Sequence, residues 1–513
     1  MTSNRSGPRG ATPRAGRPRP DPARAAPERV AEAHSRRWLD LCARHLPVCH
    51  EGSIWRYSHA PEPSDPQQGW KLHVSATVLT ACDVLRKAAP FLLGRGAKFK
   101  APRTLEEVMR LNSGVFYGYA QVGKVLTVYA RSDEEALTLA RGLHRLTRGI
   151  AAPSVPFDLK YGPGGAVHYR YGAFARAEVE TAEGGRALAI RAPDGRLVPD
   201  ARADGAAVPH WVTDPFVRDG RLPRGGAESA ASPLQVYRAF RALSQRGKGG
   251  VYQAVEVGAR PPRLCVLKEG RRWGEVNWDG RDGRWRIRNE EAALTALGGA
   301  GVRVPRVYAS FEVEGNYYLV TEFVEGESLQ AMLNRMKRRL AVGRALRLGA
   351  RLARVVADIH AAGWAWRDCK PANVVVAKTG ELIPLDFEGA TPAGRYDPLR
   401  WCTPLFAAPP APPSAPRPAS NLPEDLYALG AVVYYLLTGN SPAAAGGLPV
   451  AASRRNVPRE ASAVITRLLD ADPARRPCAR AAAQELEAAL SSAGGVAAAP
   501  AADRAASSLS ARG

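Results

Sequence analysis

The sequence predicts an α+β protein with more than one domain, and three observations lead to this fold class. The chain has 513 residues, which is more than a single ordinary domain needs. Hydrophobic residues (45%) and charged residues (24%) lie near the averages of globular proteins, so folded domains are expected. Strand-like and helix-like patterns occur on both sides of a Gly-rich stretch at 221–232, which indicates two α+β units.

Composition divides the chain into five segments. Residues 1–34 are rich in Arg and Pro, and residues 491–513 are rich in Ala and Ser, so both are expected to be disordered tails. Between them we expect globular domains at 35–220 and 233–490. Residues 221–232 would be the linker that joins the two domains.

Three elements can be placed within the first domain. Trp70–Val78 begins with alternation and is β-rich, which predicts a strand. Ala81–Ala89 has helical spacing, and we expect Pro90 to end that helix because proline lacks the amide donor. Val125–Ala130 is predicted to be another strand.

Composition also narrows the classes of function. No apolar run is long enough for a transmembrane helix, the N-terminus has no apolar signal region, and the seven cysteines contain no CxxC pair. These features predict a cytoplasmic protein with reduced thiols and no membrane partner. The net charge of +23 invites a nucleic-acid reading, but no zinc-finger or helix-turn-helix pattern supports it. An acidic peptide partner fits the same charge.

The second domain opens with a set of residues suited to phosphate chemistry. A Gly-rich turn lies between two expected strands, and its amides could approach a phosphate. Lys268 follows on a short apolar strand, and Glu290 lies in a helical segment from which it could pair with Lys268. The glycines of the turn are Gly247, Gly249 and Gly250.

Three polar residues later in this domain complete the set. Asp368 and Asn373 lie in the run Trp-Arg-Asp-Cys-Lys-Pro-Ala-Asn, and Asp386 follows a strand-like segment. Phosphoryl transfer needs a cation on the phosphates, oxygen ligands for Mg²⁺ and a carboxylate near the attacking hydroxyl. Lys268 can supply the cation, Asn373 and Asp386 the metal ligands, and Asp368 the carboxylate. Each residue alone could be an ordinary ion pair or turn, but the order and spacing together indicate chemistry.

These motifs resemble the protein kinase fold over about 233–490, which implies a bilobal domain using ATP (or GTP) and Mg²⁺. Glu322 and Val324 lie in the segment that resembles the adenine-binding hinge. Three positions depart from the family pattern: Trp366 replaces a His, Glu388 replaces a Gly, and Pro410 replaces a buttressing Glu. The first two leave the phosphoryl-transfer groups in place. The third puts the packing of the peptide-binding loop in doubt and removes the usual partner of Arg476.

The first domain holds a second candidate site. On a strand, Lys71, His73 and Ser75 share one face, where a cation and an imidazole could hold an anion and protonate it. Taken alone, this segment is better explained as an ordinary solvated strand face with an incidental His. Further cations accompany strand-like residues, namely Lys98, Lys100, Lys124 and Arg170.

Together these segments resemble the N-terminal phosphoserine/phosphothreonine lyase domain of class III and IV lanthionine synthetases, over most of 45–220. The resemblance implies that Lys100 is the general base that removes the α-proton, and that His73 is the general acid for the leaving phosphate. It also implies that Lys71, Lys124 and Arg170 hold that phosphate. A desolvated lysine crowded by cations has the lowered pKa that a base needs.

The combined reading is a peptide dehydratase of lanthipeptide-type biosynthesis. The kinase would phosphorylate Ser or Thr of a ribosomal precursor peptide with a leader, and the lyase would eliminate phosphate to give dehydroalanine or dehydrobutyrine. No Cys follows Cys478, so we expect ring closure to need a separate cyclase. The alternative is a signalling Ser/Thr protein kinase with a non-catalytic N-terminal phosphopeptide-binding domain. The presence of both Lys100 and His73 favours elimination.

Overall fold

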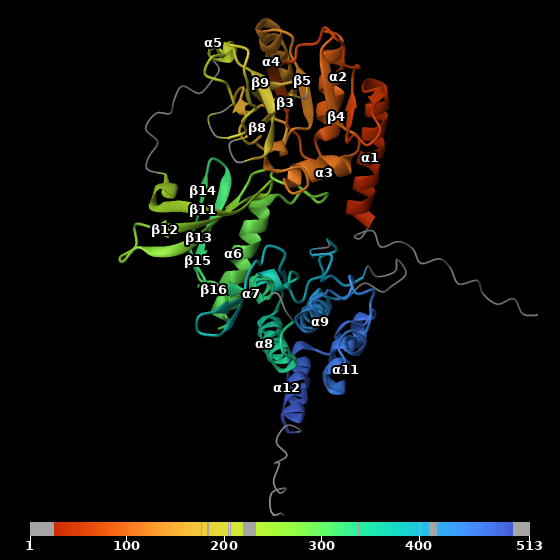
Figure 1. Ribbon diagram of the computed structural model, residues 1–513, viewed down its shortest axis with the longest axis vertical. Coiled ribbons are helices and arrows are strands. Elements are labelled where there is room, and N and C mark those ends of the chain that lie inside the picture. Colours follow the sequence, from red (N-terminus) through yellow and green to blue (C-terminus); the bar gives the residue numbers. More distant parts are fainter. Residues whose placement is uncertain are drawn as a thin grey trace, which may run out of the picture.

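The computed structural model describes residues 25–495 except 176, 182–183, 204, 206, 219–231, 337–338, 400, 402 and 410–417. The expected linker therefore falls almost wholly outside the described residues, and so does Pro410. In Figure 1 the N-terminal domain lies at the top, a five-stranded sheet lies below it, and helices of the large lobe lie at the bottom.

A seven-stranded antiparallel sheet forms the frame of the N-terminal domain. Its strand order is β1-β2-β4-β5-β3-β7-β6. The central strand β3 pairs with β5 on one side and with β7 on the other. The strands are β1 (Val48–Cys49), β2 (Trp55–Tyr57), β3 (Gln68–Val74), β4 (Lys98–Pro102), β5 (Leu126–Tyr129), β6 (Leu159–Lys160) and β7 (Val167–Ala173).

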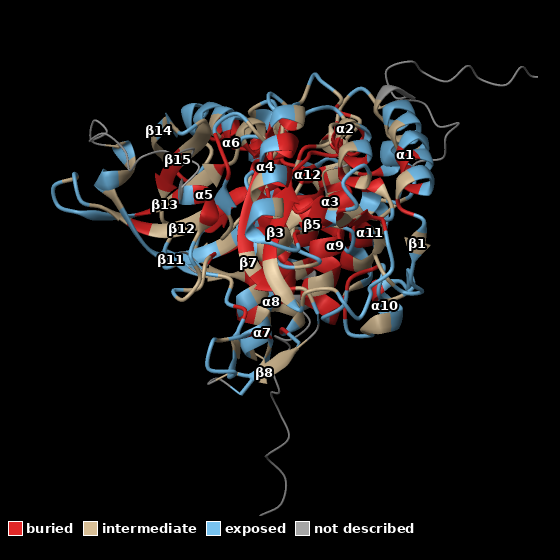
Figure 2. Ribbon diagram, turned by 90° about the horizontal axis from the view of Figure 1, so that it is seen from above, coloured by how far each residue is buried: buried red, intermediate tan, exposed pale blue. Residues whose placement is uncertain are grey.

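One face of this sheet is apolar and the other is polar. Phe99, Val128, Leu72 and Tyr169 lie in register across four strands and are buried in one hydrophobic cluster. Helices cover that face: α1 (Ala25–His45), α2 (Ala81–Leu93) and α4 (Asp133–Thr147). Because side chains alternate along a strand, the intervening residues point to the opposite face, where the predicted lyase residues lie. In Figure 2 the buried residues gather toward the middle of the view, whereas α1 at its edge is largely exposed.

Two expectations for this domain are wrong. Helix α1 begins at Ala25, so the segment up to residue 34 is helical in its last part rather than a tail; it continues into buried Trp38 and Leu41. Helix α2 runs through Pro90 to Leu93. Pro90 and Arg86 are both exposed, so the Arg86 carbonyl left without a donor faces water and the helix tolerates the proline.

Smaller elements complete the domain. Helix α3 (Leu105–Ser113) starts at Thr104, whose hydroxyl accepts a bond from the Glu107 amide, and ends in a left-handed Gly114. A three-stranded sheet of order β10-β9-β8 packs beside β7. The remaining elements are η1 (Tyr119–Gln121), β8 (Glu178–Glu180), β9 (Arg186–Arg191), β10 (Leu197–Pro199) and α5 (Pro215–Arg218).

The second domain begins with a five-stranded antiparallel sheet of order β11-β12-β13-β15-β14. Helix α6 (Gly283–Gly299) packs on β13 and β15 and is capped by the Asp282 carboxylate. The elements of this lobe are η2 (Pro233–Val236), β11 (Tyr237–Arg246), β12 (Gly249–Glu256), β13 (Arg263–Gly270), β14 (Val307–Val313) and β15 (Asn316–Glu322).

The large lobe is mostly helical. Helices α8 (Val342–Ala361), α9 (Leu422–Thr438) and α12 (Ala479–Gly495) form its core, so α12 extends past 490, where the tail was expected to begin. The other elements are β16 (Gly326–Ser328), α7 (Leu329–Met336), β17 (Trp364–Ala365), η3 (Pro371–Asn373), β18 (Val374–Ala377), β19 (Leu382–Pro384), β20 (Thr391–Pro392), α10 (Val450–Ser453), α11 (Arg459–Leu468) and η4 (Pro473–Arg475). Within the described residues, no helix has the length and apolar character needed to cross a membrane.

Candidate functional site

Strand register brings the predicted lyase residues together on the polar face of the N-terminal sheet. Lys100 on β4 pairs with Thr127 on β5, which pairs with His73 on β3, which in turn pairs with His168 on β7. Directly opposite residues share a face, so these side chains form one row. Lys71 and Arg170 pair directly in the neighbouring row. Residues from four strands thus meet on one surface.

A buried carboxylate that sequence reasoning missed joins two members of this face. Asp158 lies in the loop before β6. Its Oδ2 is 2.5 Å from His73 Nδ1, and its Oδ1 accepts a bond of 3.0 Å from Lys124 Nζ. All three side chains are at least 96% buried. Asp158 therefore fixes the ring of His73 and places Lys124 beside it.

A second carboxylate, Asp200, orients Arg170. Arg170 Nη2 donates to Asp200 Oδ1 at 2.6 Å and to the Ala201 carbonyl at 2.8 Å. Arg170 Nη1 is buried and has no hydrogen-bond partner among the described residues. A cavity of about 430 Å³ opens beside Arg170 and Asp200. A buried guanidinium nitrogen without an acceptor suits an anionic ligand such as phosphate.

Burial and mutual repulsion lower the pKa of each lysine on this face. Burial is the main cause for Lys100, with the Arg202 guanidinium adding to it, and the pKa falls to about 8. Burial also lowers the pKa of Lys124 to about 8 and that of Lys71 to about 7, against the opposing pull of Asp158 and Asp200 respectively. A substantial neutral fraction of these amines therefore exists near neutral pH.

Lys100 has an aromatic environment as well. Its Nζ lies 4.3 Å from the centre of the Trp55 ring and 6.0 Å from that of Tyr57. Ring faces favour the charged amine and oppose the effect of burial on its pKa. The rings also fix where the amine points.

Burial lowers the pKa of the His73 imidazole to about 3, although the Asp158 carboxylate pulls in the opposite direction. Burial likewise lowers the pKa of His168 to about 4. Burial works to raise the pKa of Asp158, but His73 and Lys124 outweigh it and lower that pKa, so the carboxylate stays ionised. His73 is therefore neutral at neutral pH until another negative charge arrives beside it.

The two domains touch at the Gly-rich turn. The Gly247 amide donates to the Ser113 carbonyl at the end of α3 with a distance of 3.0 Å. A Cβ on Gly247 would lie 1.6 Å from the Asn112 carbonyl oxygen, so only glycine fits there. The Asn112 side chain in turn accepts from the amide of Gly123, the neighbour of Lys124. The Gly-rich turn of the second domain therefore contacts Asn112, the residue that holds the Gly123 amide next to Lys124 in the N-terminal site.

In the second domain the structure joins Lys268 to Glu290. Lys268 Nζ lies 2.7 Å and 2.8 Å from the two carboxylate oxygens. Burial works to lower the pKa of Lys268, but Glu290 and Asp386 outweigh it and raise that pKa. The lysine therefore stays charged beside the Gly-rich hairpin, where Gly249 has a φ of +153° and Val251 pairs with Lys268.

Asp368 lies in a network of polar side chains from the large lobe. Its carboxylate accepts bonds from Lys370 Nζ (2.7 Å), Asn373 Nδ2 (2.8 Å) and the Thr403 hydroxyl (3.2 Å). Burial and the Asp386 carboxylate raise the pKa of Asp368. A carboxylate of raised pKa, held among donors, is suited to accept a hydroxyl proton.

A buried carboxylate holds the loop that carries Asp368. Asp425 is fully buried on α9 and accepts from the amides of Trp366 (2.7 Å) and Arg367 (2.6 Å). Trp366 stands where a His was expected, and its indole Nε1 donates to the Leu385 and Asp386 carbonyls at 3.1 and 3.2 Å. The indole thus fixes the segment that holds Asp386.

The residues expected to hold Mg²⁺ fit that ion. Asn373 Nδ2 donates to Asp368, so the side-chain oxygen of Asn373 is available as a metal ligand. Lys248 and Lys268 lower the pKa of Asp386 against the effect of burial, so that carboxylate is ionised. Within the described part of the chain, one group of three acidic side chains is close enough to share an ion: Glu290, Asp386 and Glu388. Oxygen ligands of this kind suit Mg²⁺.

Glu388, the departure from glycine, pairs with Lys248 of the Gly-rich turn. Glu322, predicted to belong to the hinge, ends β15 and pairs with Arg303. Val324, the other predicted hinge residue, follows two positions later. Arg476 donates to the carbonyls of Pro423 (2.7 Å) and Asp470 (2.9 Å). Backbone carbonyls thus hold its guanidinium, while Pro410 lies outside the described residues.

Comparison with known proteins assigns both domains. Residues 44–228 match the family model "RamC, N-terminal domain", and residues 247–486 match "Protein kinase domain". The chain is 32% identical over 404 residues to a "Probable SapB synthase" from Streptomyces coelicolor, a match that covers 75% of this chain and 42% of that protein. It is 30% identical over 221 residues to serine/threonine-protein kinase PknA from Mycobacterium tuberculosis, covering 41% of this chain and 48% of that one.

A solved structure of a point mutant of the PknI kinase domain from Mycobacterium tuberculosis matches with a TM-score of 0.38 and 22% identity, covering 50% of this chain and 95% of that one. The chain spans less than half the length of the two relatives named above. It carries a RamC N-terminal domain followed by a protein kinase domain. Protein kinase domains in general use ATP and Mg²⁺.

Proposed function

We propose that the chain is a peptide dehydratase of lanthipeptide-type biosynthesis. Its kinase domain phosphorylates Ser or Thr of a ribosomal precursor peptide, and its N-terminal domain then eliminates the phosphate. The observation that carries the proposal is the polar sheet face, where a desolvated Lys100 lies in one row with a carboxylate-held His73. A module that only binds phosphopeptide needs cations but no acid–base pair.

Residues 71, 124 and 170 supply the phosphate site in this proposal. Lys71, Lys124 and Arg170 lie on or beside one face, and the buried Nη1 of Arg170 awaits an acceptor. A bound phosphoryl dianion would raise the pKa of Lys71 and Lys124 and keep both charged. It would also raise the pKa of His73, in the same direction as Asp158 and against burial. Substrate binding thereby protonates the general acid.

Lys100 and His73 then carry out the elimination as base and acid. The neutral amine of Lys100 takes the proton from the α-carbon, and the C–H electron pair forms the double bond to the β-carbon. The bond between the β-carbon and the phosphate oxygen breaks, and His73 donates its proton to the leaving phosphate. Asp158 holds the imidazolium through Nδ1, which leaves Nε2 as the donor. The tight pair with Asp158 also explains how a buried imidazolium is tolerated.

The kinase residues divide the first step among themselves. Asp368 accepts the proton of the substrate hydroxyl, and Lys370 and Thr403 keep its carboxylate in place. Lys268, positioned by Glu290, binds nucleotide phosphates beside Gly247, Gly249 and Gly250. Asn373 and Asp386 would hold Mg²⁺, and the bound magnesium nucleotide (ATP or GTP) supplies the phosphoryl group. Backbone groups of Glu322 and Val324 would form hydrogen bonds with the purine base of the nucleotide.

A short precursor peptide that contains Ser, Thr and Cys tests the proposal. The unsubstituted chain with nucleotide and Mg²⁺ should produce dehydrated peptide, which mass spectrometry detects as loss of water. Lys100→Ala should accumulate phosphopeptide, and Asp368→Asn should leave the peptide unmodified. Stable phosphopeptide from the unsubstituted chain would refute the lyase assignment.

One observation favours a second candidate, a signalling Ser/Thr kinase with an N-terminal phosphopeptide-binding domain. The Trp55 and Tyr57 rings beside Lys100 favour a charged amine, which binds phosphate but cannot take a proton. This candidate predicts tight binding of a phosphopeptide with no loss of phosphate.

A further inference from the structure

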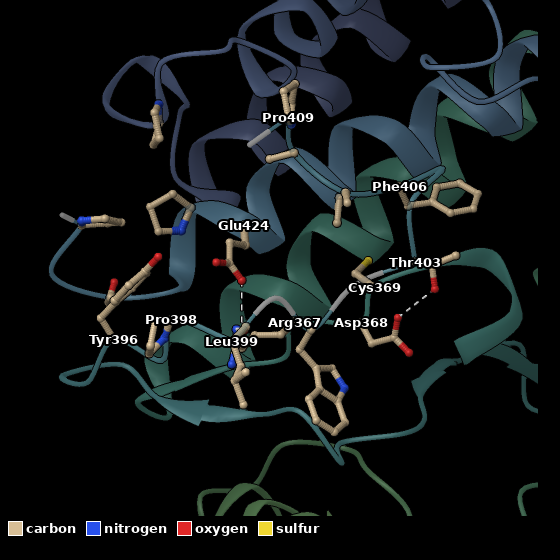
Figure 3. Close-up of a pocket in the computed structure, with 18 of the residues that line it drawn as sticks. Arg367, Asp368, Cys369, Tyr396, Pro398, Leu399, Thr403, Phe406, Pro409 and Glu424 are labelled. Carbon is tan, nitrogen blue, oxygen red and sulfur yellow. Dashed lines mark hydrogen bonds and ion pairs between the residues drawn. The ribbon is translucent and has the colours of Figure 1, made fainter. Parts of the chain in front are cut away.

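A groove beside Asp368 is built by both domains. It has a volume of about 450 Å³, and Asp368 and Thr403 lie in its wall, as Figure 3 shows. Most of the groove belongs to the large lobe. Pro27, Glu28 and Ala31 also line it, and these residues belong to α1 of the N-terminal domain.

An aromatic contact fixes α1 at this position. The His34 ring on α1 lies 6.0 Å from the ring of Trp278, which precedes α6 in the kinase domain. Trp278 also lines the groove and packs against the hydrophobic core of the N-terminal domain. In Figure 1 the start of α1 points down toward the large lobe. The helix is therefore a wall of the groove rather than a distant neighbour.

The residues that line the groove indicate which peptide side chains it can bind. Its apolar side chains include Leu399, Trp401 and Phe406. Its arginines are already engaged, because Arg367 pairs with Asp397 and Glu424, and Arg476 donates to carbonyls. Glu28 on α1 adds an exposed carboxylate to the lining, which also holds the Glu424 carboxylate paired with Arg367. Apolar residues next to the acceptor hydroxyl would fit this lining, and acidic residues would be repelled.

We propose that helix α1 of the N-terminal domain forms part of the acceptor-peptide site of the kinase. Its occupant is an extended peptide segment in which apolar, uncharged residues flank the acceptor Ser or Thr. The position of the groove, with Asp368 in its wall, argues for this occupant over any other. The inference rests on the proposed kinase step, and it makes the N-terminal domain a specificity element for phosphorylation as well as for elimination.

Ala31→Trp tests this role by filling the groove from α1, and Ala33→Trp is the matched control. Ala31 is half-buried and lines the groove, whereas Ala33 is exposed on the same helix. The substrate is a peptide with leucine on both sides of one serine, and phosphorylation is the sum of phosphorylated and dehydrated product. Ala31→Trp should lower kcat/KM for this peptide about tenfold or more. The KM for nucleotide should not change.

Reversing the charge of Glu28 changes the preference between two peptides, a ratio that partial misfolding would not alter. The unsubstituted chain should prefer the leucine-flanked peptide to a glutamate-flanked one, and Glu28→Arg should narrow that preference about twofold to fivefold. Elimination from a synthetic phosphopeptide, measured without nucleotide, checks that the N-terminal domain is intact in each variant. Equal kcat/KM for Ala31→Trp and Ala33→Trp, with an unchanged preference in Glu28→Arg, would overturn the inference. Failure of the unsubstituted chain to phosphorylate any peptide would instead refute the proposed function itself.

Discussion

The carboxylate of Asp158 touches both His73 and Lys124, so its removal perturbs the acid and the phosphate site together. We expect Asp158→Asn to slow elimination strongly and to leave phosphorylation unchanged. The asparagine keeps the size of the side chain but cannot balance the charge of an imidazolium. His73 would then lose the partner that supports its protonated form.

The structure sets the expected magnitude. The Asp158 side chain is fully buried, and those of Lys124 and His73 are 3% and 4% exposed. Breaking such a buried pair costs about 3–5 kcal/mol of folding free energy when the remaining charge stays. Lys124 can lose its proton, since its pKa is about 8 even with Asp158 present, and this reduces the cost. A positioned general acid contributes about 10²–10⁴ in rate, so kcat should fall by at least about 100-fold.

The assay is elimination from a synthetic phosphoserine peptide without nucleotide, followed by mass spectrometry. Phosphorylation of the unmodified peptide by the same variant is the internal control, because the Asp158 carboxylate bonds to His73 and Lys124 of the N-terminal domain. Asp158→Glu should restore part of the activity, and thermal unfolding should show whether the variant is folded. A folded Asp158→Asn protein that eliminates phosphate within about threefold of the unsubstituted chain would refute the role given to His73.

Three further outcomes are expected. Elimination should rise with pH through about 8, because Lys100 accepts a proton only when neutral; Lys100→Arg, measured over the same pH range, should abolish the activity. The free energy of unfolding should decrease as pH falls from about 6.5 toward 4. The reason is that His73 and His168 have pKa values of about 3 and 4 in the folded chain, so the unfolded chain binds protons first. Denaturant titrations in which the unfolding free energy of His168→Asn varies with pH as steeply as that of the unsubstituted chain would contradict this. Asp425→Ala should lower the free energy of unfolding by about 3 kcal/mol or more, because it leaves the amides of Trp366 and Arg367 without their buried acceptor; a denaturant midpoint equal to that of the unsubstituted chain would oppose it.

The proximity of the predicted kinase residues could be anticipated because these residues lie in short motifs. Asp368, Asn373 and Asp386 occur within one stretch of the chain, and the structure brings them together with Lys268 and Glu290. Alternation on β3 likewise placed Lys71 and His73 on one face. Local periodicity is enough for such predictions.

The supporting carboxylates were not predictable. Asp158 lies 85 residues from His73, in a loop without a pattern, and Asp200 lies 30 residues from Arg170. Their partners are set by strand order, which no local signal encodes. Arg202 escaped notice for the same reason. A buried cation without an assigned counter-ion was the signal that could have prompted a search for them.

The predicted helix boundaries were wrong where burial against the domain core determined how far a helix extends. Pro90 was expected to end α2, yet the proline faces water and the apolar side of the helix continues to Leu92. Residues 25–34 have the composition of the tail that precedes them. They are helical in α1, whose later turns bury Trp38 in the domain core. Tertiary packing thus outweighed composition.

The most direct test of the central claim is incubation of the chain with a synthetic phosphothreonine or phosphoserine peptide, in the absence of nucleotide. The proposed chemistry predicts release of inorganic phosphate and a dehydrated peptide from the unsubstituted chain. Lys100→Ala should return the phosphopeptide unchanged. Phosphopeptide that binds the unsubstituted chain and is recovered intact would contradict the lyase and leave a kinase with a recognition domain.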